Sequence, residues 1–263
     1  MSKATMKFRG VKQMNEGTID HQERTVEINK KRYGFDELSF DSPVSRTIYG
    51  TLLNYKGAYE ALEASMQEEP YNAPPNAPIL YIKPENTFAG FGSPIPLPTD
   101  VTELEIGAAL GVVIGKTATQ VKETEALEYV KGYTIVNDVS IPHESVHRPA
   151  VKQKARDGFC PIGPWITDCS AIENPNKLQI RVKINDEVKQ ENNTENLIRS
   201  VENLIADVTA FMTLHAGDTL LVGVPENAPL VEENDRVQVE IEGIGVLENI
   251  IRSERDVVGG DTL

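Results

Sequence analysis

The chain has 263 residues, of which 40% are hydrophobic, enough to bury one large core. Its formal net charge is −14 at pH 7, and so acidic a chain is a poor partner for nucleic acids and for anionic membrane surfaces. Two cysteines are too few for a disulfide framework, and no apolar run is long enough to cross a bilayer, so a cytoplasmic protein is expected. An anionic small molecule stays compatible with this composition, because a binding site can be locally basic.

The first 50 residues are predicted to form a small N-terminal β module. They are polar and contain short β-like runs at residues 25–28 and 32–34, which a turn at residues 29–31 would join. Residues 51–263 are predicted to form one larger domain.

Most of the remaining chain is expected to be β structure with a few packed helices, which indicates a mixed α/β but β-rich fold. Asn185 and Asp186 are typical of a hairpin turn between two strands. Strands are predicted at residues 47–53, 79–82, 110–114, 133–139, 178–184, 219–222, 235–241 and 246–252.

Helices are predicted at residues 57–67, 123–131 and 197–212. Gly132 is expected to end the second helix, because glycine is favoured just past a helix C-terminus. The third helix has apolar residues at a spacing of about 3.6. Asn193 or Thr194 is its candidate N-terminal cap.

The string HESVH at residues 143–147 fits the H-E-x-x-H pattern of zinc proteases. That chemistry needs both histidines on one face of a stable helix and a third ligand. Pro142 and Pro149 leave six residues between them, too few for the usual helix, and the next histidine, His215, lies beyond several predicted strands. The string is interpreted as a polar loop, although a glutamate or aspartate as third ligand leaves the zinc alternative open.

Four segments, in this order and at these spacings, together resemble the fumarylacetoacetate hydrolase family. They read LGVVIGK at residues 110–116, GYTIVND at 132–138, KARDGFCPIGPW at 154–165, and LHAGD through EIEGIG at 214–245. The resemblance implies a fumarylacetoacetate hydrolase C-terminal-like fold, in which rolled mixed β-sheets pack with a few helices.

The family's chemistry centres on a bound cation. A 2-oxo or 2-enol carboxylate chelates Mg²⁺ or Mn²⁺, and the cation stabilises the enolate that forms when a C–C bond breaks or a proton moves. The resemblance implies that Asp138 is a metal ligand and that Lys154 is catalytic, pairing with the substrate carboxylate or moving a proton. It also implies substrate contacts at Asp157 and Thr194.

The chain departs from the family pattern at three places. Gly107 and Ala109 stand where the family has two metal-binding glutamates spaced E-x-E. Val222 and Val224 replace the threonines of a T-G-T-P run, and Ala58 stands where the family often has histidine. One remaining carboxylate cannot hold Mg²⁺ tightly, so weak or absent metal binding is expected.

Glu103 and Glu105 form an E-x-E pair displaced by four residues. On a strand they share a face with Gly107, but four residues span about 13 Å, and the nearer glutamate sits about 7 Å away. A metal–carboxylate bond is only about 2.0–2.6 Å long. A bulge or shifted strand that brings Glu105 closer would rebuild the site, and this alternative stays open.

Runs at residues 70–75, 81–87 and 156–163 narrow the resemblance to the N-terminal half of the two-half isomerase/decarboxylases of aromatic catabolism. It implies a subunit that works with a related, metal-bearing subunit. Together they would decarboxylate 5-carboxymethyl-2-oxo-hex-3-ene-1,6-dioate and isomerise 2-hydroxyhepta-2,4-diene-1,7-dioate. The alternatives are a non-catalytic homo-oligomer that binds a small 2-oxo dicarboxylate, and another family hydrolase or oxaloacetate-type decarboxylase with a rebuilt site. Whether the chain alone is an enzyme is left open.

Overall fold

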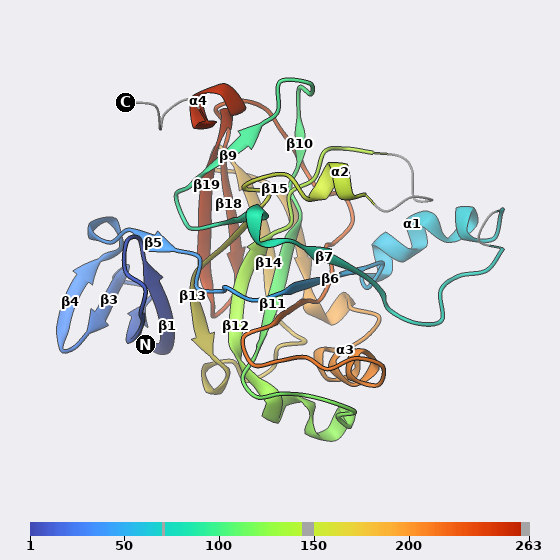
Figure 1. Cartoon of the computed structure of the whole chain (residues 1–263), viewed down its shortest axis with the longest axis horizontal. Helices are drawn as coiled ribbons and strands as arrows, with labels where there is room; N and C mark the ends of the chain where they lie inside the picture. Colours follow the sequence, from blue (N-terminus) through green and yellow to red (C-terminus); the bar gives the residue numbers. More distant parts are fainter. Residues whose placement is uncertain (70–71, 144–149, 259–263) are drawn as a thin grey trace.

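Two β-sheets and a two-stranded ribbon frame the protein (Figure 1). The structure is a computed structural model, and it describes residues 1–69, 72–143 and 150–258. The strands are β1 (Ser2–Phe8), β2 (Met14–Asp20), β3 (Thr25–Ile28), β4 (Lys31–Gly34), β5 (Phe40–Asp41), β6 (Ile48–Leu52), β7 (Ile79–Lys83), β8 (Phe88–Ala89), β9 (Pro94–Leu97), β10 (Leu104–Glu105), β11 (Ala108–Ile114), β12 (Val130–Asn137), β13 (Cys160–Asp168), β14 (Gln179–Ile184), β15 (Glu187–Asn193), β16 (Thr219–Leu221), β17 (Leu230–Val231), β18 (Arg236–Ile241) and β19 (Gly245–Ser253). The helices are α1 (Lys56–Met66), α2 (Val151–Lys154), α3 (Val201–Thr209) and α4 (Glu254–Val258), and the 3₁₀ turns are η1 (Phe35–Glu37), η2 (Glu85–Thr87), η3 (Glu123–Tyr129), η4 (Cys169–Ala171) and η5 (Thr194–Asn196).

The larger sheet follows the order β4-β3-β2-β1-β13-β12-β11-β16-β6-β7, with β5 pairing β1 and β8 pairing β13. The smaller sheet follows the order β15-β14-β18-β19-β9, and β10 pairs with β17 as a separate ribbon. Most pairs are antiparallel, but β16–β6, β13–β8 and β19–β9 are parallel. These open, mixed sheets confirm the β-rich fold that the sequence predicts.

The main core lies between the two sheets, and β11 shows why its sequence is a continuous apolar run. Leu110 and Val112 point into the core shared with the smaller sheet. Ala109 and Val113 point to the other face, into a second apolar cluster with Val136. A strand that is covered on both faces reads as uninterrupted hydrophobic sequence rather than as an alternation.

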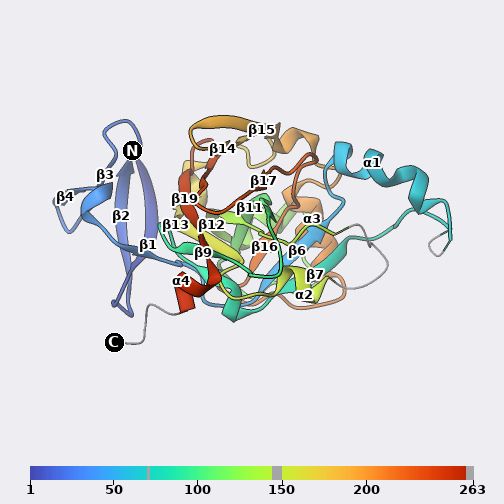
Figure 2. The ribbon, with the colours of Figure 1, turned by 90° about the horizontal axis from the view of Figure 1, so that it is seen from above.

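The N-terminal strands extend the larger sheet beyond β13. Met6 of β1 lies opposite Trp165 of β13. The rings of Phe35 and Phe40 pack 5.1 and 5.7 Å from that indole, whose N–H donates to the carbonyl of Ile244 at 2.8 Å. Figure 2 shows β1 to β4 at one end of the molecule and α1 at the other. A division at residue 50 stays a prediction.

The predicted hairpins and most predicted strands are confirmed. Asn29 and Lys30 have φ angles of 51° and 66° between β3 and β4, and Asn185 and Asp186 have 50° and 69° between β14 and β15. Two consecutive residues with positive φ suit the twist of a tight hairpin, and asparagine and aspartate tolerate that conformation.

The predicted helix at residues 123–131 is wrong in type and length. The segment forms the 3₁₀ turn η3, and the chain then enters β12 directly. Gly132 lies inside β12 and does not end a helix. A Cβ there would lie 2.1 Å from the carbonyl oxygen of Thr167 on β13, so the close approach of the neighbouring strand requires glycine.

The predicted helix at residues 197–212 is shorter in the structure, because its first residues pair with another segment. The N–H of Ile198 donates to the carbonyl of Asn54 at 2.8 Å, which keeps this part extended. α3 begins after Ser200, whose side chain caps it, whereas Asn193 caps η5.

The predicted helix at residues 57–67 is confirmed by α1. Within the described ranges, no helix is long and apolar enough to span a membrane.

Gly132→Ala should lower the free energy of unfolding by about 1–3 kcal/mol, because the added methyl group overpacks the β12–β13 contact. Urea denaturation measures the change. Gly34→Ala is the matched control, since the nearest atom to its new Cβ would lie at 3.7 Å, and a shift within about 0.5 kcal/mol is expected. Equal effects at the two positions would contradict the steric explanation.

Candidate functional site

A buried charged cluster lies where the ends of β7, β12 and α2 meet. Asp138 directly follows β12, Lys83 ends β7 and Lys154 ends α2. The side chains of Asp138 and Lys83 have no solvent exposure, and that of Lys154 is 16% exposed. In the sheet order β12-β11-β16-β6-β7, the first and last strands are not neighbours, so the sheet curls to bring them together.

Both carboxylate oxygens of Asp138 have cationic partners. Oδ1 forms an ion pair with Lys83 Nζ at 2.9 Å, without the alignment of a hydrogen bond. Oδ2 accepts a hydrogen bond from Lys154 Nζ at 2.8 Å and another from the Tyr81 hydroxyl. Burial by itself would raise the pKa of Asp138, but the charges of Lys154 and Lys83 outweigh it and hold that pKa well below its usual value. The carboxylate is therefore ionised, and the cluster carries one net positive charge.

Tyr81 reaches the cluster by crossing its neighbouring strand. A Cβ at Gly50 of β6 would lie 2.0 Å from the Tyr81 ring, so the ring lies directly over this glycine. Burial, followed by the negative charge of Asp138, raises the pKa of Tyr81 well above its usual value. The hydroxyl therefore stays protonated and donates. Lys154 Nζ also lies 5.1 Å from the centre of the Tyr81 ring, within cation–π range.

The positions of the family's E-x-E pair are closed in by neighbouring atoms. A Cβ at Gly107 would lie 2.5 Å from the carbonyl oxygen of Asp138 and 3.1 Å from Val224 Cγ2. The backbones meet there because the Asp138 N–H donates to the Gly107 carbonyl at 2.7 Å. Ala109 is fully buried in an apolar cluster opposite Val136. A side chain at residue 107 would need a backbone shift, and a carboxylate at residue 109 would be buried among apolar groups.

Glu103 and Glu105, the displaced E-x-E pair, also form no metal site among the described residues. Glu105 lies in β10 opposite Leu230, and its N–H donates to the carbonyl of Ser140 at 2.8 Å. Across residues 1–69, 72–143 and 150–258, no three His, Cys, Asp or Glu side chains converge to hold a metal ion. An oxygen-ligated divalent cation prefers several carboxylates, whereas Asp138 is already paired with two ammonium groups. The described residues therefore do not fit such a cation.

Two further predicted site residues lie apart from the cluster. Asp157 is exposed, and its carboxylate accepts a hydrogen bond from Asn86 Nδ2 at 2.7 Å. Thr194 is buried; its hydroxyl donates to the carbonyl of Pro175 at 2.9 Å and accepts from the N–H of Leu178 at 2.8 Å. These contacts give the Thr194 hydroxyl a structural role, and the predicted substrate contacts at both residues stay predictions.

The remaining departures from the family pattern are packing positions. Val222 is buried in the main core, and Ala58 packs against that core. In the H-E-x-x-H string, His143 Nδ1 lies 3.0 Å from the carbonyl oxygen of Ile141. The rest of the string, residues 144–147, lies outside the described residues, and so does Tyr71 of the proline-rich run.

Lys83 and Tyr81 are the site residues that the sequence reasoning missed. Both stand in the run YIKP, which carries part of the family resemblance, but no role followed from it. A signal was present, because residues two apart on a strand share a face. A tyrosine and a lysine on one face of an otherwise apolar strand indicate a polar partner on that side.

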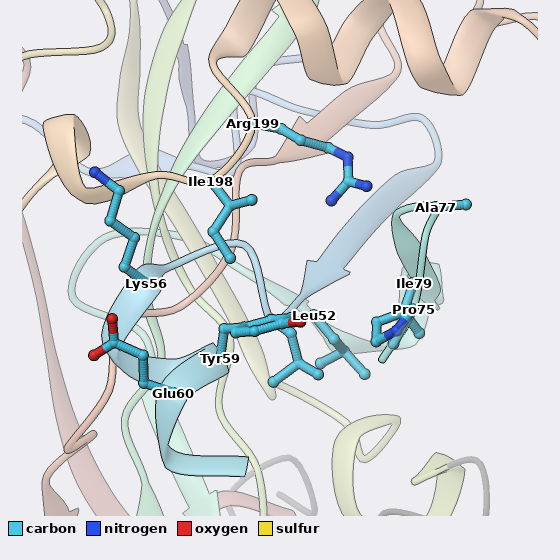
Figure 3. A pocket seen from close by; sticks show the side chains of 10 residues that line it. Leu52, Lys56, Tyr59, Glu60, Pro75, Ala77, Ile79, Ile198 and Arg199 are labelled. Carbon is cyan, nitrogen blue, oxygen red and sulfur yellow. The ribbon is translucent and has the colours of Figure 1, made fainter. Parts of the chain in front are cut away.

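A hollow of about 340 Å³ lies elsewhere, between α1 and the ends of β6 and β7 (Figure 3). Lys56 and Tyr59 of α1 line one part of it and Arg199 another. Arg199 pairs with Asp207 at 2.9 Å and donates to the carbonyl of Asn76 at 3.0 Å. None of the residues lining this hollow belongs to the Asp138 cluster.

The fumarylacetoacetate hydrolase C-terminal family model matches residues 47–252. The chain belongs to this family. It is 42% identical, over 211 residues, to the 4-hydroxyphenylacetate degradation bifunctional isomerase/decarboxylase of Escherichia coli. The match covers 80% of this chain and 48% of that protein, so the chain spans about half the length of this relative.

Solved structures share the fold over nearly the whole chain. The 5-carboxymethyl-2-hydroxymuconate delta-isomerase of Mycobacterium smegmatis is 26% identical, with a TM-score of 0.79 and coverage of 96% of this chain and 99% of that one. The maleylpyruvate hydrolase of Sphingobium sp. SYK-6, in complex with manganese(II) ion and pyruvate, has a TM-score of 0.78 over 95% of this chain and 99% of that one. At 22% identity, this second likeness shows the fold alone.

The two cysteines should differ sharply in reactivity. Cys160 is buried beside the cluster, and burial raises the pKa of its thiol to about 12, whereas Cys169 is partly exposed. Iodoacetamide at pH 8 should label one thiol per native chain and two after denaturation, as measured by intact mass. Cys169→Ser should leave the native chain unlabelled. Rapid native labelling of Cys160 would contradict the packing described for β13.

Proposed function

We propose that this chain is a subunit of an isomerase/decarboxylase that acts on 2-hydroxyhepta-2,4-diene-1,7-dioate and its carboxylated precursor in 4-hydroxyphenylacetate catabolism. The 42% identity to the E. coli bifunctional enzyme supports this reaction class. The match spans 48% of that enzyme, and a second, related unit that completes the activity is part of the proposal. We propose that this second unit is related in sequence and retains the E-x-E pair.

The charge pairing of Asp138 is the observation on which the proposed roles of the two units rest. In the family's chemistry a divalent cation supplies the stabilisation of the enolate. Here the corresponding aspartate is neutralised by Lys83 and Lys154, and Gly107 has no room for a side chain. The chain's own contribution is therefore proposed to be substrate binding, with the Lys154 ammonium pairing with a carboxylate of the diacid. The metal-bearing subunit would carry most of the chemistry.

A non-catalytic homo-oligomer that binds a small 2-oxo dicarboxylate is the second candidate. The net positive charge of the Asp138 cluster favours diacid binding without requiring turnover. The two candidates differ in what a metal-bearing partner does to the activity.

The purified chain alone should turn over 2-hydroxyhepta-2,4-diene-1,7-dioate slowly at saturating Mg²⁺. Co-expression with a family member that retains the E-x-E pair should yield a complex with higher activity than that partner alone. Ultraviolet absorbance of the conjugated diene follows the reaction, and size-exclusion chromatography checks the complex. High Mg²⁺-dependent turnover by the chain alone would refute the proposed dependence on a partner. Diacid binding without any complex or activation would favour the homo-oligomer.

Lys154→Met should weaken binding of oxalate by about 10- to 100-fold, because a charge-assisted hydrogen bond contributes about 1.5–3 kcal/mol. Isothermal calorimetry measures the affinity, and circular dichroism checks folding. Lys152→Met is the matched control, because Lys152 lies on the same short helix and is exposed. Equal losses in the two variants would point to the general charge of α2 instead of a site at Lys154.

A further inference from the structure

The hollow of about 340 Å³ beside α1 has apolar walls that are open to solvent (Figure 3). Leu52 ends β6, Ile79 begins β7 and Ile198 precedes α3. These three residues are 41%, 37% and 42% exposed. Large apolar residues that are exposed together around one concave surface indicate that another molecule covers it.

The main chain of Arg199 is fixed at this hollow by the side chain of Asn54. Asn54 Oδ1 accepts a hydrogen bond from the Arg199 N–H at 2.9 Å, and Asn54 Nδ2 donates to the Arg199 carbonyl at 3.1 Å. The same amide donates to the carbonyl of Val222 at 2.8 Å. Because Asn54 and Val222 are both buried, the segment that carries Arg199 is anchored to the core.

The guanidinium group of Arg199 is held in place, but only some of its donors are used. Nε donates to Asp207 at 2.9 Å, and Nη2 donates to the carbonyl of Asn76 at 3.0 Å. Within the part of the chain that the structure describes, the two N–H groups of Nη1 have no acceptor. A guanidinium fixed in this way is preorganised to donate to a carboxylate.

The remaining groups around the hollow define the ligand further. Figure 3 shows the Tyr59 ring and the Arg199 guanidinium on opposite sides of the hollow. Lys56 adds a second positive charge at the rim, where its Nζ lies 3.5 Å from the carbonyl oxygen of Glu195, and Glu60 adds one negative charge. A cavity of about 150 Å³ can hold benzene, so this hollow has room for one ring with a short acidic side chain.

We propose that the hollow is a second binding site, which takes a small aromatic monocarboxylate. The carboxylate accepts hydrogen bonds from Nη1 of Arg199, and the ring packs against Tyr59 and the apolar wall formed by Leu52 and Ile198. None of the lining residues belongs to the Asp138 cluster, so this site is distinct from the diacid site of the proposed function.

A titration of the ¹⁵N-labelled chain with phenylacetate, followed by amide chemical shifts, tests the site. Saturable shifts should appear at Leu52, Lys56 and Ile198, with a Kd on the order of 1 mM or lower. 2-Phenylethanol keeps the ring without the charge, and acetate keeps the charge without the ring. Each should bind at least about tenfold more weakly than phenylacetate. Equal affinity for phenylacetate and 2-phenylethanol overturns the carboxylate assignment, and an absence of saturable shifts at these residues overturns the proposal.

Two variants separate ligand binding from a structural role of Arg199. Arg199→Met should lower phenylacetate affinity about 10- to 100-fold, because it removes a charge-assisted hydrogen bond. Asp207→Asn breaks the same ion pair but keeps the guanidinium, so affinity should be unchanged or higher. Equal losses in the two variants would show that Arg199 only anchors the segment before α3, which overturns the proposal.

A wall variant decides the question if Arg199→Met does not fold. Leu52→Asp changes an exposed residue and places a negative charge in the wall of the hollow. A loss of phenylacetate affinity of at least about tenfold supports the site, and unchanged affinity overturns it.

The other occupant to test is a second copy of the chain. If a second copy covers the hollow, the wild-type chain should elute as a dimer in size-exclusion chromatography and Leu52→Asp as a monomer. Phenylacetate would then not bind, and that result overturns the proposal.

The outcomes are separate from those of the proposed function. Lys154→Met should leave phenylacetate affinity within about threefold of wild type, since Lys154 does not line the hollow, and oxalate should not compete. Loss of oxalate binding at Lys154 leaves the second site standing. Failure of phenylacetate binding leaves the subunit proposal standing.

Discussion

Asp138 carries its negative charge in the interior of a β-rich protein, and the surrounding site is arranged to compensate it. A buried carboxylate without partners would be costly, whereas here each oxygen lies within 3 Å of an ammonium nitrogen. Removing one partner of such a group leaves an uncompensated buried charge. The cluster therefore constrains both the stability of the curled sheet and the kind of ligand that can approach it.

That compensation depends on strands that are distant in the sheet. Lys83 comes from the edge strand β7, Asp138 from the end of β12, and Lys154 from the short helix α2. The ammonium group of Lys83 contacts both other residues: it forms an ion pair with the Asp138 carboxylate and donates a hydrogen bond to the main-chain carbonyl of Lys154. Gly50 makes a related contribution, because only a residue without a side chain lets the Tyr81 ring pass over β6. The curl of the larger sheet and the charge of the cluster are thus mutually dependent.

The departures from the family pattern form a consistent set in the structure. Gly107 accommodates a close main-chain contact, Ala109 fills an apolar cluster, and Val224 lies against the Gly107 backbone. Each position is suited to packing, and together they surround a cluster whose cations are side chains.

The amino-acid sequence by itself determined the family, the hairpin turns and the fully apolar strand β11. It also singled out Asp138 and Lys154, which a 2.8 Å hydrogen bond joins in the structure, and their functional roles stay predictions. These depend on local conformational preference, on hydropathy period and on motif spacing, all of which act over short stretches of chain. The predicted helix at residues 123–131 was wrong because Gly132 is required by the close approach of the neighbouring strand and does not end a helix. The predicted start of α3 was too early because the main chain of Ile198 pairs with that of Asn54. Only the tertiary structure decided that Lys83 and Tyr81 reach Asp138. The reason is physical: strands far apart in sheet order meet only when the sheet curls, and no local pattern records which of them will meet.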